Sequence, residues 1–271
     1  MGKVKGLDIF VVRALTRKRK KYKQLSIAYF SVAISAAIFI GYIAYLIVRT
    51  HEVKFVDYNE FGIAIPQNYQ IHGIDVSRYQ DHIVWNAVSQ MDVRNVKLGF
   101  AFIKATEGVN DADPYFKRNW KKAKEAGMVR GAYHYFLPNK DAKAQVKNFV
   151  KNVKLESGDL PPVLDIEDTK GASKAKVQKE VKAWLQLMEA TYHVKPIIYT
   201  FLNFYDEYLK GVFDEYPLWV AHYEQPERPR IERDWTFWQH SESGRVNGIG
   251  SRVDFDVFNG DSSAFRALLL P

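Results

Sequence analysis

The chain contains no cysteine, and this absence limits the chemistry available to it. With 271 residues, 7 His and no Cys, it has neither a disulfide framework nor a thiolate metal site. The His, Asp and Glu residues show no metal-ligand spacing, so we expect no metal and no cofactor. A GxxxxGK[ST] phosphate loop and a Gly-x-Ser-x-Gly nucleophile elbow are missing as well, which argues against nucleotide chemistry and a serine-hydrolase site.

Acidic residues are nearly missing from the first 48 positions. This segment holds nine Lys or Arg and one acid, Asp8, whereas the remainder holds 30 basic and 30 acidic residues. The formal net charge of +8 therefore lies in the N-terminal segment. Because the remainder has no overall cationic field, we do not expect a nucleic-acid partner.

Charged residues are missing altogether from Leu25 to Val48, a run of 24 residues. Such a run is long enough to span a bilayer as a helix. The basic segment before it includes Arg17 to Lys21, and the positive-inside rule then places the N-terminus in the cytoplasm. A cleaved signal peptide is the alternative, but the run is long for one and no A-x-A-like site closes it.

These features predict a single-pass protein of the cytoplasmic (inner) membrane whose main domain faces the periplasm or the cell wall. The expected parts are a basic cytoplasmic tail over 1–24, a transmembrane helix over 25–48, a connector over 49–70 and a folded domain over 71–271. The basic tail can also contact anionic lipid head groups.

The domain alternates short apolar runs with amphipathic stretches, which favours an α/β fold with a parallel sheet. Five expected strands are each followed by a helix, and three further strands have little helix between them, which indicates an irregular, incomplete (β/α) barrel. The expected strands are His72–Val76, Leu98–Lys104, Val129–Phe136, Pro162–Glu167, Pro196–Thr200, Leu218–His222, Trp235–His240 and Val253–Phe258.

Two carboxylates two residues apart, Asp165 and Glu167, end the fourth expected strand. Residues i and i+2 of a strand point to one face, so both carboxylates are aimed at one spot. Burial of two like charges raises a pKa and leaves one group protonated at neutral pH. A protonated carboxylic acid beside an ionised one can cleave a glycosidic bond, although a surface pair or a cation site would show the same spacing.

Polar side chains also end the other expected strands. Asp75, Lys104, Tyr133 and Tyr199 lie at or near the ends of the first, second, third and fifth strands. In (β/α) barrels the chemistry lies at the C-terminal ends of the strands. We therefore expect these side chains to meet the Asp165 and Glu167 pair in one site.

Several short segments together carry a family pattern, in order along some 200 residues. They are Gly73–Ser77 with Gln80, Phe102–Gly108, Asp113–Phe116 with Asn119, Gly131–Phe136, Leu164–Glu167, Pro196–Thr200, Leu218–Tyr223, Trp238–Gln239, Gly248–Ile249 and Val253–Asp254. Through them the chain from Ile71 to about Leu270 resembles the lysozymes of glycoside hydrolase family 25, the Chalaropsis-type N-acetylmuramidases. The first 50 residues lie outside the resemblance.

The resemblance implies a flattened barrel of about eight strands that cleaves the β-1,4 bond between N-acetylmuramic acid and N-acetylglucosamine. It also implies four site carboxylates. Glu167 matches the proton donor, Asp165 matches the partner carboxylate, and Asp75 and Asp254 match a flanking pair. Asp165 would act as a nucleophile or would stabilise an oxazolinium formed by the substrate. Asp256 shares strand parity with Asp254, and we favour Asp254 as the residue that faces the site.

Further residues are expected to bind substrate. Tyr133, Tyr199, Trp219 and Trp238 lie at strand positions, where they either contact a sugar ring or belong to the core. Lys104 lies inside an apolar strand, and a buried lysine needs a partner, so we expect it to pair with a site carboxylate. His134 is more typical of a hydrogen-bonded core histidine than of a ligand.

The resulting prediction is a membrane-anchored hydrolase that acts on peptidoglycan strands in cell-wall remodelling. Two alternatives remain open. One is a catalytically silent glycan-binding scaffold on the same fold, although the retained carboxylates argue against it. The other is a different glycosidase on a related barrel, such as a chitinase. A longer acidic run usually precedes the Asp-x-Glu pair in that group, whereas Pro161–Leu164 occupies those places here.

Overall fold

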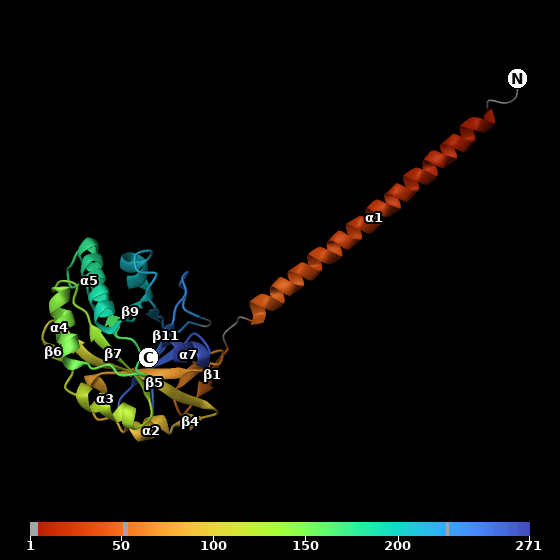
Figure 1. Ribbon diagram of the computed structural model, residues 1–271. Helices are drawn as coiled ribbons and strands as arrows, with labels where there is room; N and C mark the ends of the chain where they lie inside the picture. The colour runs from red at the N-terminus through yellow and green to blue at the C-terminus, as the bar shows by residue number, and fades with distance from the viewer. Residues whose placement is uncertain (1–4, 51–53, 226–227) are drawn as a thin grey trace. The chain divides into compact units, whose positions relative to one another are not determined.

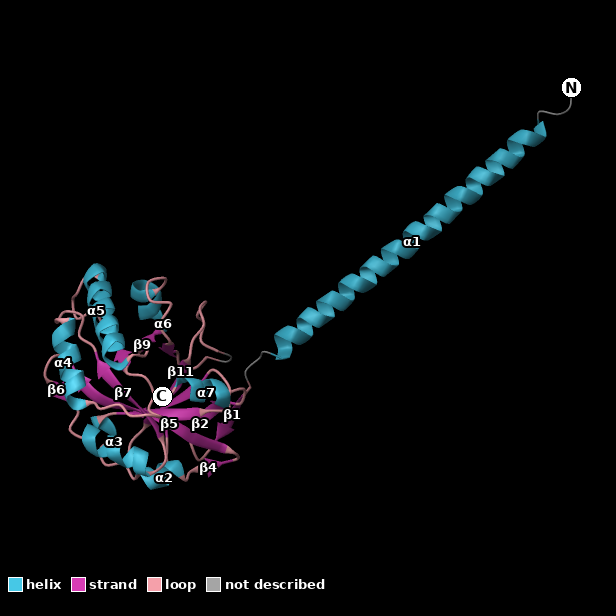
Figure 2. Ribbon diagram, viewed as in Figure 1, coloured by secondary structure: helices cyan, strands magenta, loops and turns pink. Residues whose placement is uncertain are grey.

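The structure is a computed structural model that describes residues 5–50, 54–225 and 228–271 (Figure 1). The chain divides into two compact units after residue 52. The first consists of one helix, and the second is a barrel with helices around it (Figure 2).

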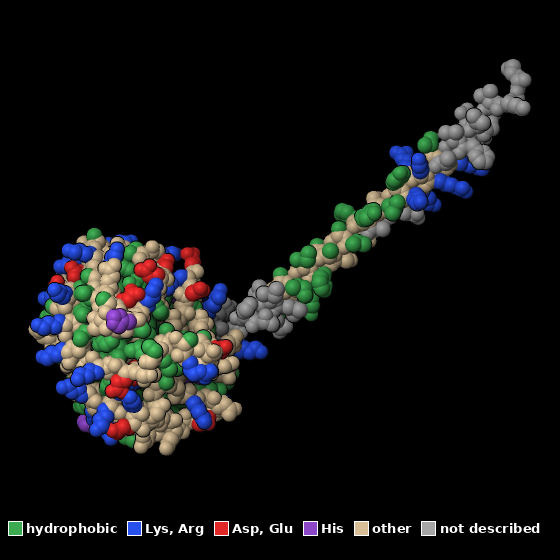
Figure 3. Space-filling view, viewed as in Figure 1, with side chains coloured by type: hydrophobic (Ala, Val, Ile, Leu, Met, Phe, Trp, Pro, Cys, Tyr) green, Lys and Arg blue, Asp and Glu red, His purple; other side chains and the backbone are tan. Residues whose placement is uncertain are grey.

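The first unit contains helix α1 (Lys5–Thr50). Within it, Leu15–Tyr45 is long and apolar enough to cross a membrane by length and composition. Lys and Arg side chains gather on one part of α1, and apolar side chains cover the part that follows (Figure 3). The predicted transmembrane segment 25–48 falls inside this helix, and its membrane insertion stays a prediction.

The second unit begins with a hairpin where the sequence predicts a connector. Strands β1 (Phe55–Tyr58) and β2 (Ile63–Pro66) pair in antiparallel register. Phe61 is fully buried, with its ring centroid 5.3 Å from that of Phe255 on the barrel. Residues 55–66 therefore belong to the folded domain, because their apolar side chains pack on strands that come later in the chain, as Phe61 does on Phe255.

Eight strands close the barrel. In spatial order they are β3 (His72–Val76), β12 (Val253–Phe258), β11 (Phe237–Gly244), β10 (Leu218–Ala221), β9 (Ile197–Phe201), β8 (Val163–Asp165), β7 (Val129–Tyr135) and β5 (Val96–Glu107). Pairing of β3 with β5 closes the ring, and all neighbours are parallel except β12, which is antiparallel to both of its own. The predicted α/β barrel of about eight strands is thus confirmed.

Helices and short elements surround the barrel. The α-helices are α2 (Trp85–Ser89), α3 (Phe116–Glu125), α4 (Ala142–Asn152), α5 (Lys174–Tyr192), α6 (Leu202–Phe204) and α7 (Ser262–Leu268). A 3-10 turn η1 (Arg78–Gln80), a π-helical turn η2 (Tyr205–Leu209) and short strands β4 (Asp92–Val93) and β6 (Asp111–Ala112) complete the fold. Side chains of Asp141 and Ser173 accept backbone N–H bonds at the starts of α4 and α5, which fixes where these helices begin.

Strand alternation divides the apolar residues into two cores. Phe100, Phe102, Trp219 and Phe237 fill the barrel interior, whereas the intervening residues pack outward. Two interior glycines make room for these rings. A Cβ on Gly73 would lie 2.4 Å from the Phe100 ring, and one on Gly131 would lie 2.4 Å from Phe102. The aromatic interior forms the floor beneath the polar residues at the C-terminal strand ends.

Candidate active site

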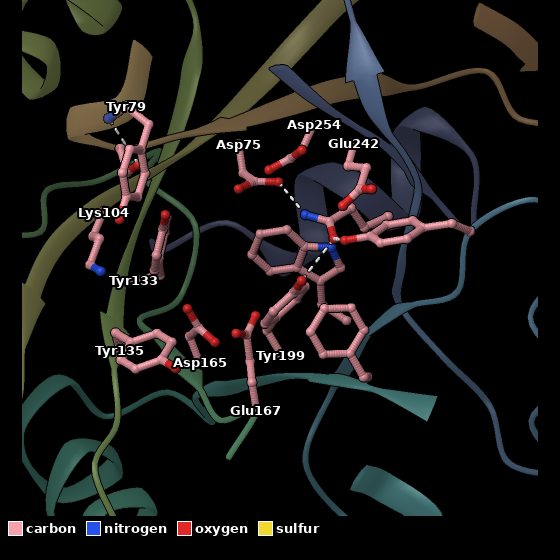
Figure 4. Close-up of a pocket in the computed structure, with 15 residues that line it drawn as sticks. Asp75, Tyr79, Lys104, Tyr133, Tyr135, Asp165, Glu167, Tyr199, Glu242 and Asp254 are labelled. Atoms are coloured by element: carbon pink, nitrogen blue, oxygen red, sulfur yellow. Dashed lines mark hydrogen bonds between the residues drawn. The ribbon is translucent and has the colours of Figure 1, made fainter. Parts of the chain in front are cut away.

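A cavity of about 210 Å³ opens at the C-terminal ends of the barrel strands (Figure 4). Eight of the ten residues predicted for the site line it: Asp75, Lys104, Tyr133, Asp165, Glu167, Tyr199, Trp219 and Asp254. They come from seven different strands or the loops just after them. The C-terminal ends of the parallel strands and the start of the antiparallel β12 meet at this end of the barrel, which brings residues from distant parts of the sequence into one place.

Asp165 and Glu167 lie together on one side of the cavity (Figure 4). Asp165 ends β8 and is 5% exposed, and its Oδ1 atom has no hydrogen-bond partner among the described residues. Burial and then the charge of Glu167 raise the pKa of Asp165 well above its usual value. Burial also raises the pKa of Glu167, and the Tyr199 hydroxyl and Lys104 partly offset this rise. The pair therefore retains a proton when ordinary carboxyls have lost theirs.

Asp75 and Asp254 form a second carboxyl pair across the cavity (Figure 4). They are directly opposite each other on the antiparallel strands β3 and β12. Burial and then the charge of Glu242 raise the pKa of Asp254 to about 7, and a hydrogen bond with Asp75 opposes this rise. Burial followed by the charge of Asp254 raises the pKa of Asp75 well above its usual value. Two carboxyls in such contact hold a proton between them.

Gln239 links this second pair to the aromatic wall. The side chain is 2% exposed, and its Nε2 donates to Asp75 Oδ2 at 2.6 Å. Its Oε1 accepts bonds from the hydroxyls of Tyr199, at 2.7 Å, and Tyr223, at 2.6 Å. The Gln239 amide thus fixes the position of Asp75, Tyr199 and Tyr223. Its amide nitrogen faces the Asp75 carboxylate, and its amide oxygen faces the two tyrosine hydroxyls.

Lys104 pairs differently from the prediction. It is 9% exposed, and its Nζ donates to Glu107 Oε2 at 2.7 Å, so its partner is a carboxylate outside the predicted set. The same Nζ lies 4.8 Å from the centroid of the Tyr135 ring. The positive charge of Lys104 partly offsets the rise in the pKa of Asp165 and of Glu167, so Lys104 lies within electrostatic reach of the pair.

Two of the predicted residues lie away from the cavity. Asp256 is fully buried in the interior and accepts a 2.8 Å bond from Trp219 Nε1. Trp238 is also fully buried, but on the outer side of β11, where its Nε1 donates to the His222 carbonyl. The prediction that Trp238 contacts a sugar ring is corrected by this position, because interior Phe237 and Gln239 flank it on the strand and force it outward.

His134 has the core environment that the sequence suggests. Its Nδ1 lies 2.7 Å from Thr106 Oγ1, and its Nε2 lies 3.1 Å from Gln145 Oε1. Burial lowers its pKa to about 4, so the ring is neutral at neutral pH. Within residues 5–50, 54–225 and 228–271, no cluster of three or more His, Asp or Glu side chains is placed to hold a metal ion.

Several cavity residues were missed from sequence alone: Ser77, Tyr79, Tyr135, Phe201, Tyr223, Gln239 and Glu242. Strand parity was available as a signal for three of them, since Tyr135 follows Tyr133, Phe201 follows Tyr199 and Gln239 follows Phe237, each by two positions. Glu242 lies beyond a register shift in β11, where parity no longer applies.

Comparison with known proteins identifies relatives for this geometry. The family model described as "Glycosyl hydrolases family 25" matches residues 74–249. "Uncharacterized protein YegX" of Escherichia coli (strain K12) is 46% identical over 223 residues, which cover 81% of this chain and 82% of that protein. "Lysozyme M1" of Streptomyces globisporus is 35% identical, covering 73% and 71%. A family 25 glycosyl hydrolase structure from Bacillus anthracis matches with a TM-score of 0.69 and 31% identity, covering 78% and 98%.

Proposed function

The chain belongs to glycosyl hydrolase family 25, and from this membership we propose that it cleaves the β-1,4 bond between N-acetylmuramic acid and N-acetylglucosamine in peptidoglycan. The chain is a glycoside hydrolase of the lysozyme type. The observation that carries the proposal is the pair of Asp165, which is buried, and Glu167, which is half-buried, on one side of a cavity lined by tyrosines.

Glu167 is the proton donor in this proposal. It is the more exposed member of the pair, so its carboxyl can reach the oxygen of a glycosidic bond laid across the cavity. As that bond breaks, positive charge develops on the anomeric carbon, which favours the ionised form of the neighbouring Asp165. The proton that the pair holds in the free enzyme is thereby left on Glu167 at the moment of transfer.

Asp165 is the partner carboxylate. Its carboxylate lines the cavity beside Glu167 and can act on the anomeric centre, either as nucleophile or as stabiliser of an oxazolinium that the substrate's acetamido group forms. Both routes retain configuration at the anomeric carbon. Water then completes the hydrolysis, with Glu167 now acting as base.

Asp75 and Asp254 position the substrate from the opposite wall. Because they share a proton, they can both donate and accept hydrogen bonds to sugar hydroxyl and amide groups. Gln239 holds Asp75 in place, and Tyr133 and Trp219 supply apolar faces beside the pair. Asp256 supports Trp219 from below and has no contact with the cavity in this proposal.

The same proposal assigns the enzyme to the cytoplasmic membrane, held by residues 25–48 with the N-terminus inside. The apolar helix and the preceding basic residues support this assignment. Held in this way, the enzyme would act on wall polymer within reach of its anchor, in remodelling.

The experiment that tests the catalytic assignment is turnover of peptidoglycan by the full-length chain in nonionic detergent. Glu167→Gln and Asp165→Asn should each lower the rate by 100-fold or more, about the size of a lost general-acid contribution. Phe201→Leu, at the cavity wall, serves as the control and should retain substantial activity. Turnover of Glu167→Gln at the parental rate, with parental tryptophan fluorescence, would contradict the assignment, and inactivity of the parent chain would favour the silent scaffold.

A further inference from the structure

Helices α4 and α5 pack against each other and present lysines to solvent. On α4, Lys143, Lys147 and Lys151 recur every four residues and so share one face. The exposed lysines of α5 are Lys174, Lys176, Lys179 and Lys182, and Lys140 and Lys154 flank α4. We call these nine residues the lysine face. Figure 3 shows Lys and Arg side chains along this edge of the domain.

The lysine face carries many more lysines than acids. Among the described residues, none of its nine lysines forms an ion pair, whereas on α3 Lys121 and Lys122 pair with Glu125, and Lys124 pairs with Glu156. Two acids lie among these lysines: Asp141, which caps α4, and Glu180, which accepts the Ala142 N–H at 2.9 Å. Nine lysines against two acids leave an excess of positive charge, and the mutual repulsion of these cations favours binding of a polyanion here.

The lysine face begins beside the cavity. Helices α4 and α5 follow β7 and β8, so their N-termini lie at the cavity end of the barrel. Asn139, just before α4, donates to the Lys170 carbonyl at 3.2 Å and accepts from Lys176 Nζ at 3.3 Å. Lys170 in turn lies 5.7 Å from the centroid of Tyr135, which lines the cavity. A polymer that leaves the cavity on this side therefore meets the lysines directly.

We propose that the lysine face is a second binding surface, for the carboxylate-bearing peptides of the peptidoglycan strand whose glycan occupies the cavity. The inference rests on the proposed function. The cavity itself is lined by five carboxyl residues, Asp75, Asp165, Glu167, Glu242 and Asp254, so it repels anionic peptides. The lysine face attracts the same groups one helix away. The acidic cavity thus binds the glycan, and the lysine face binds the anionic peptides.

The lysine face and the hairpin through which the chain enters the domain lie on different parts of the barrel. The hairpin β1–β2, where the chain enters the domain, packs on β11 and β12 through Phe55–Trp238 and Phe61–Phe255. Helices α4 and α5 follow β7 and β8, which are separated from β11 and β12 by the strands β9 and β10 in the barrel (Figure 1). Within the barrel domain, the lysine face therefore lies away from the hairpin β1–β2.

The test is sedimentation of the full-length chain, in nonionic detergent, with purified peptidoglycan sacculi. All samples carry Glu167→Gln so that the sacculi stay intact. The variant Lys143→Gln/Lys147→Gln/Lys151→Gln should bind about tenfold more weakly at low salt, and the difference should vanish near 1 M salt. The matched control, Lys121→Gln/Lys122→Gln/Lys124→Gln, removes three charges that are internally paired and should change binding less than twofold. Glutamine preserves helix propensity in both.

Two further arms separate the possible causes. Amidation of the sacculus carboxylates should reduce parental binding to that of the α4 variant. On peptide-free glycan strands, chains with Glu167 intact should turn over equally with or without the α4 substitutions. Equal binding by the α4 variant and its α3 control, or undiminished binding to amidated sacculi, would overturn the inference. Failure of the parent to cleave peptide-free glycan would instead contradict the proposed function, and the binding comparison would stand independently of it.

Discussion

The substitution Gln239→Leu removes the amide that holds the cavity together while nearly preserving side-chain volume. It leaves Asp75 Oδ2 without the 2.6 Å donor and leaves the Tyr199 and Tyr223 hydroxyls without their common acceptor. Asp75 and Tyr199 are 7% and 5% exposed, so water cannot readily replace what they lose. Tyr223 is only half-buried, and its hydroxyl can turn to solvent.

The magnitude follows from these burial differences. A buried polar group left without its partner costs about 1–3 kcal/mol. Two such groups give a loss of roughly 2–6 kcal/mol in the free energy of unfolding, a large share of the 5–15 kcal/mol typical of a domain. Turnover should fall as well, because Asp75 loses the contact that orients it.

Urea denaturation followed by tryptophan fluorescence is a suitable assay. All six Trp residues lie at or after position 85, so the signal of the full-length chain reports the barrel domain alone. Tyr199→Phe supplies the second edge of a double-mutant cycle. It should destabilise the parent by about 1 kcal/mol and should have little further effect when Gln239 is already Leu.

Two results would refute the reasoning. If Gln239→Leu unfolds at the parental urea concentration, the hydrogen bonds of Gln239 do not stabilise the domain. If Tyr199→Phe costs the same in both backgrounds, the hydroxyl of Tyr199 does not depend on Gln239.

Two other predictions follow from burial and from the anchor. Burial and the charge of Asp254 raise the pKa of Asp256, so the folded chain retains a proton that the unfolded chain releases above about pH 4. The parent therefore loses stability as pH rises above about 4, whereas Asp256→Asn stays neutral. The free energy of unfolding of Asp256→Asn should rise relative to that of the parent by up to about 1.4 kcal/mol per pH unit. A difference between the two that is the same in urea titrations at pH 5 and pH 8 would contradict this. Deletion of residues 1–48 should give a soluble chain with parental turnover on solubilised glycan, and its recovery in the membrane fraction would remove the anchor assignment.

The position of the site was predictable because it depends on local rules. Alternation within each strand and the meeting of parallel strand ends are set by backbone geometry. They are sufficient to bring Asp75, Lys104, Asp165 and Tyr199 together from four strands. The eight barrel strands were recognisable for the same reason, although β5 extends to Glu107 and β8 is only three residues long.

How deeply a side chain is buried, and which residues far apart in the sequence contact each other, were not predictable in this way. Asp256 has the parity of Asp254, but two residues along a strand are more than 6 Å, and this step takes it below the cavity to Trp219. The partner of Lys104 depends on the irregularity in β5 between Lys104 and Thr106, which brings Glu107 to it. The Gln239–Asp75 bond joins residues 164 positions apart, and the hairpin β1–β2 packs on strands near the other end of the chain. Such contacts leave no periodicity in the sequence.

The measurement that tests the central claim most directly is the identity of the sugar at each new reducing end. The full-length chain and its Glu167→Gln variant would be incubated with peptidoglycan, the products reduced with borohydride, and the fragments read by mass spectrometry. We predict fragments that end in reduced muramitol, from the parent only. Fragments that end in reduced glucosaminitol, or the same fragments from Glu167→Gln, would contradict the claim.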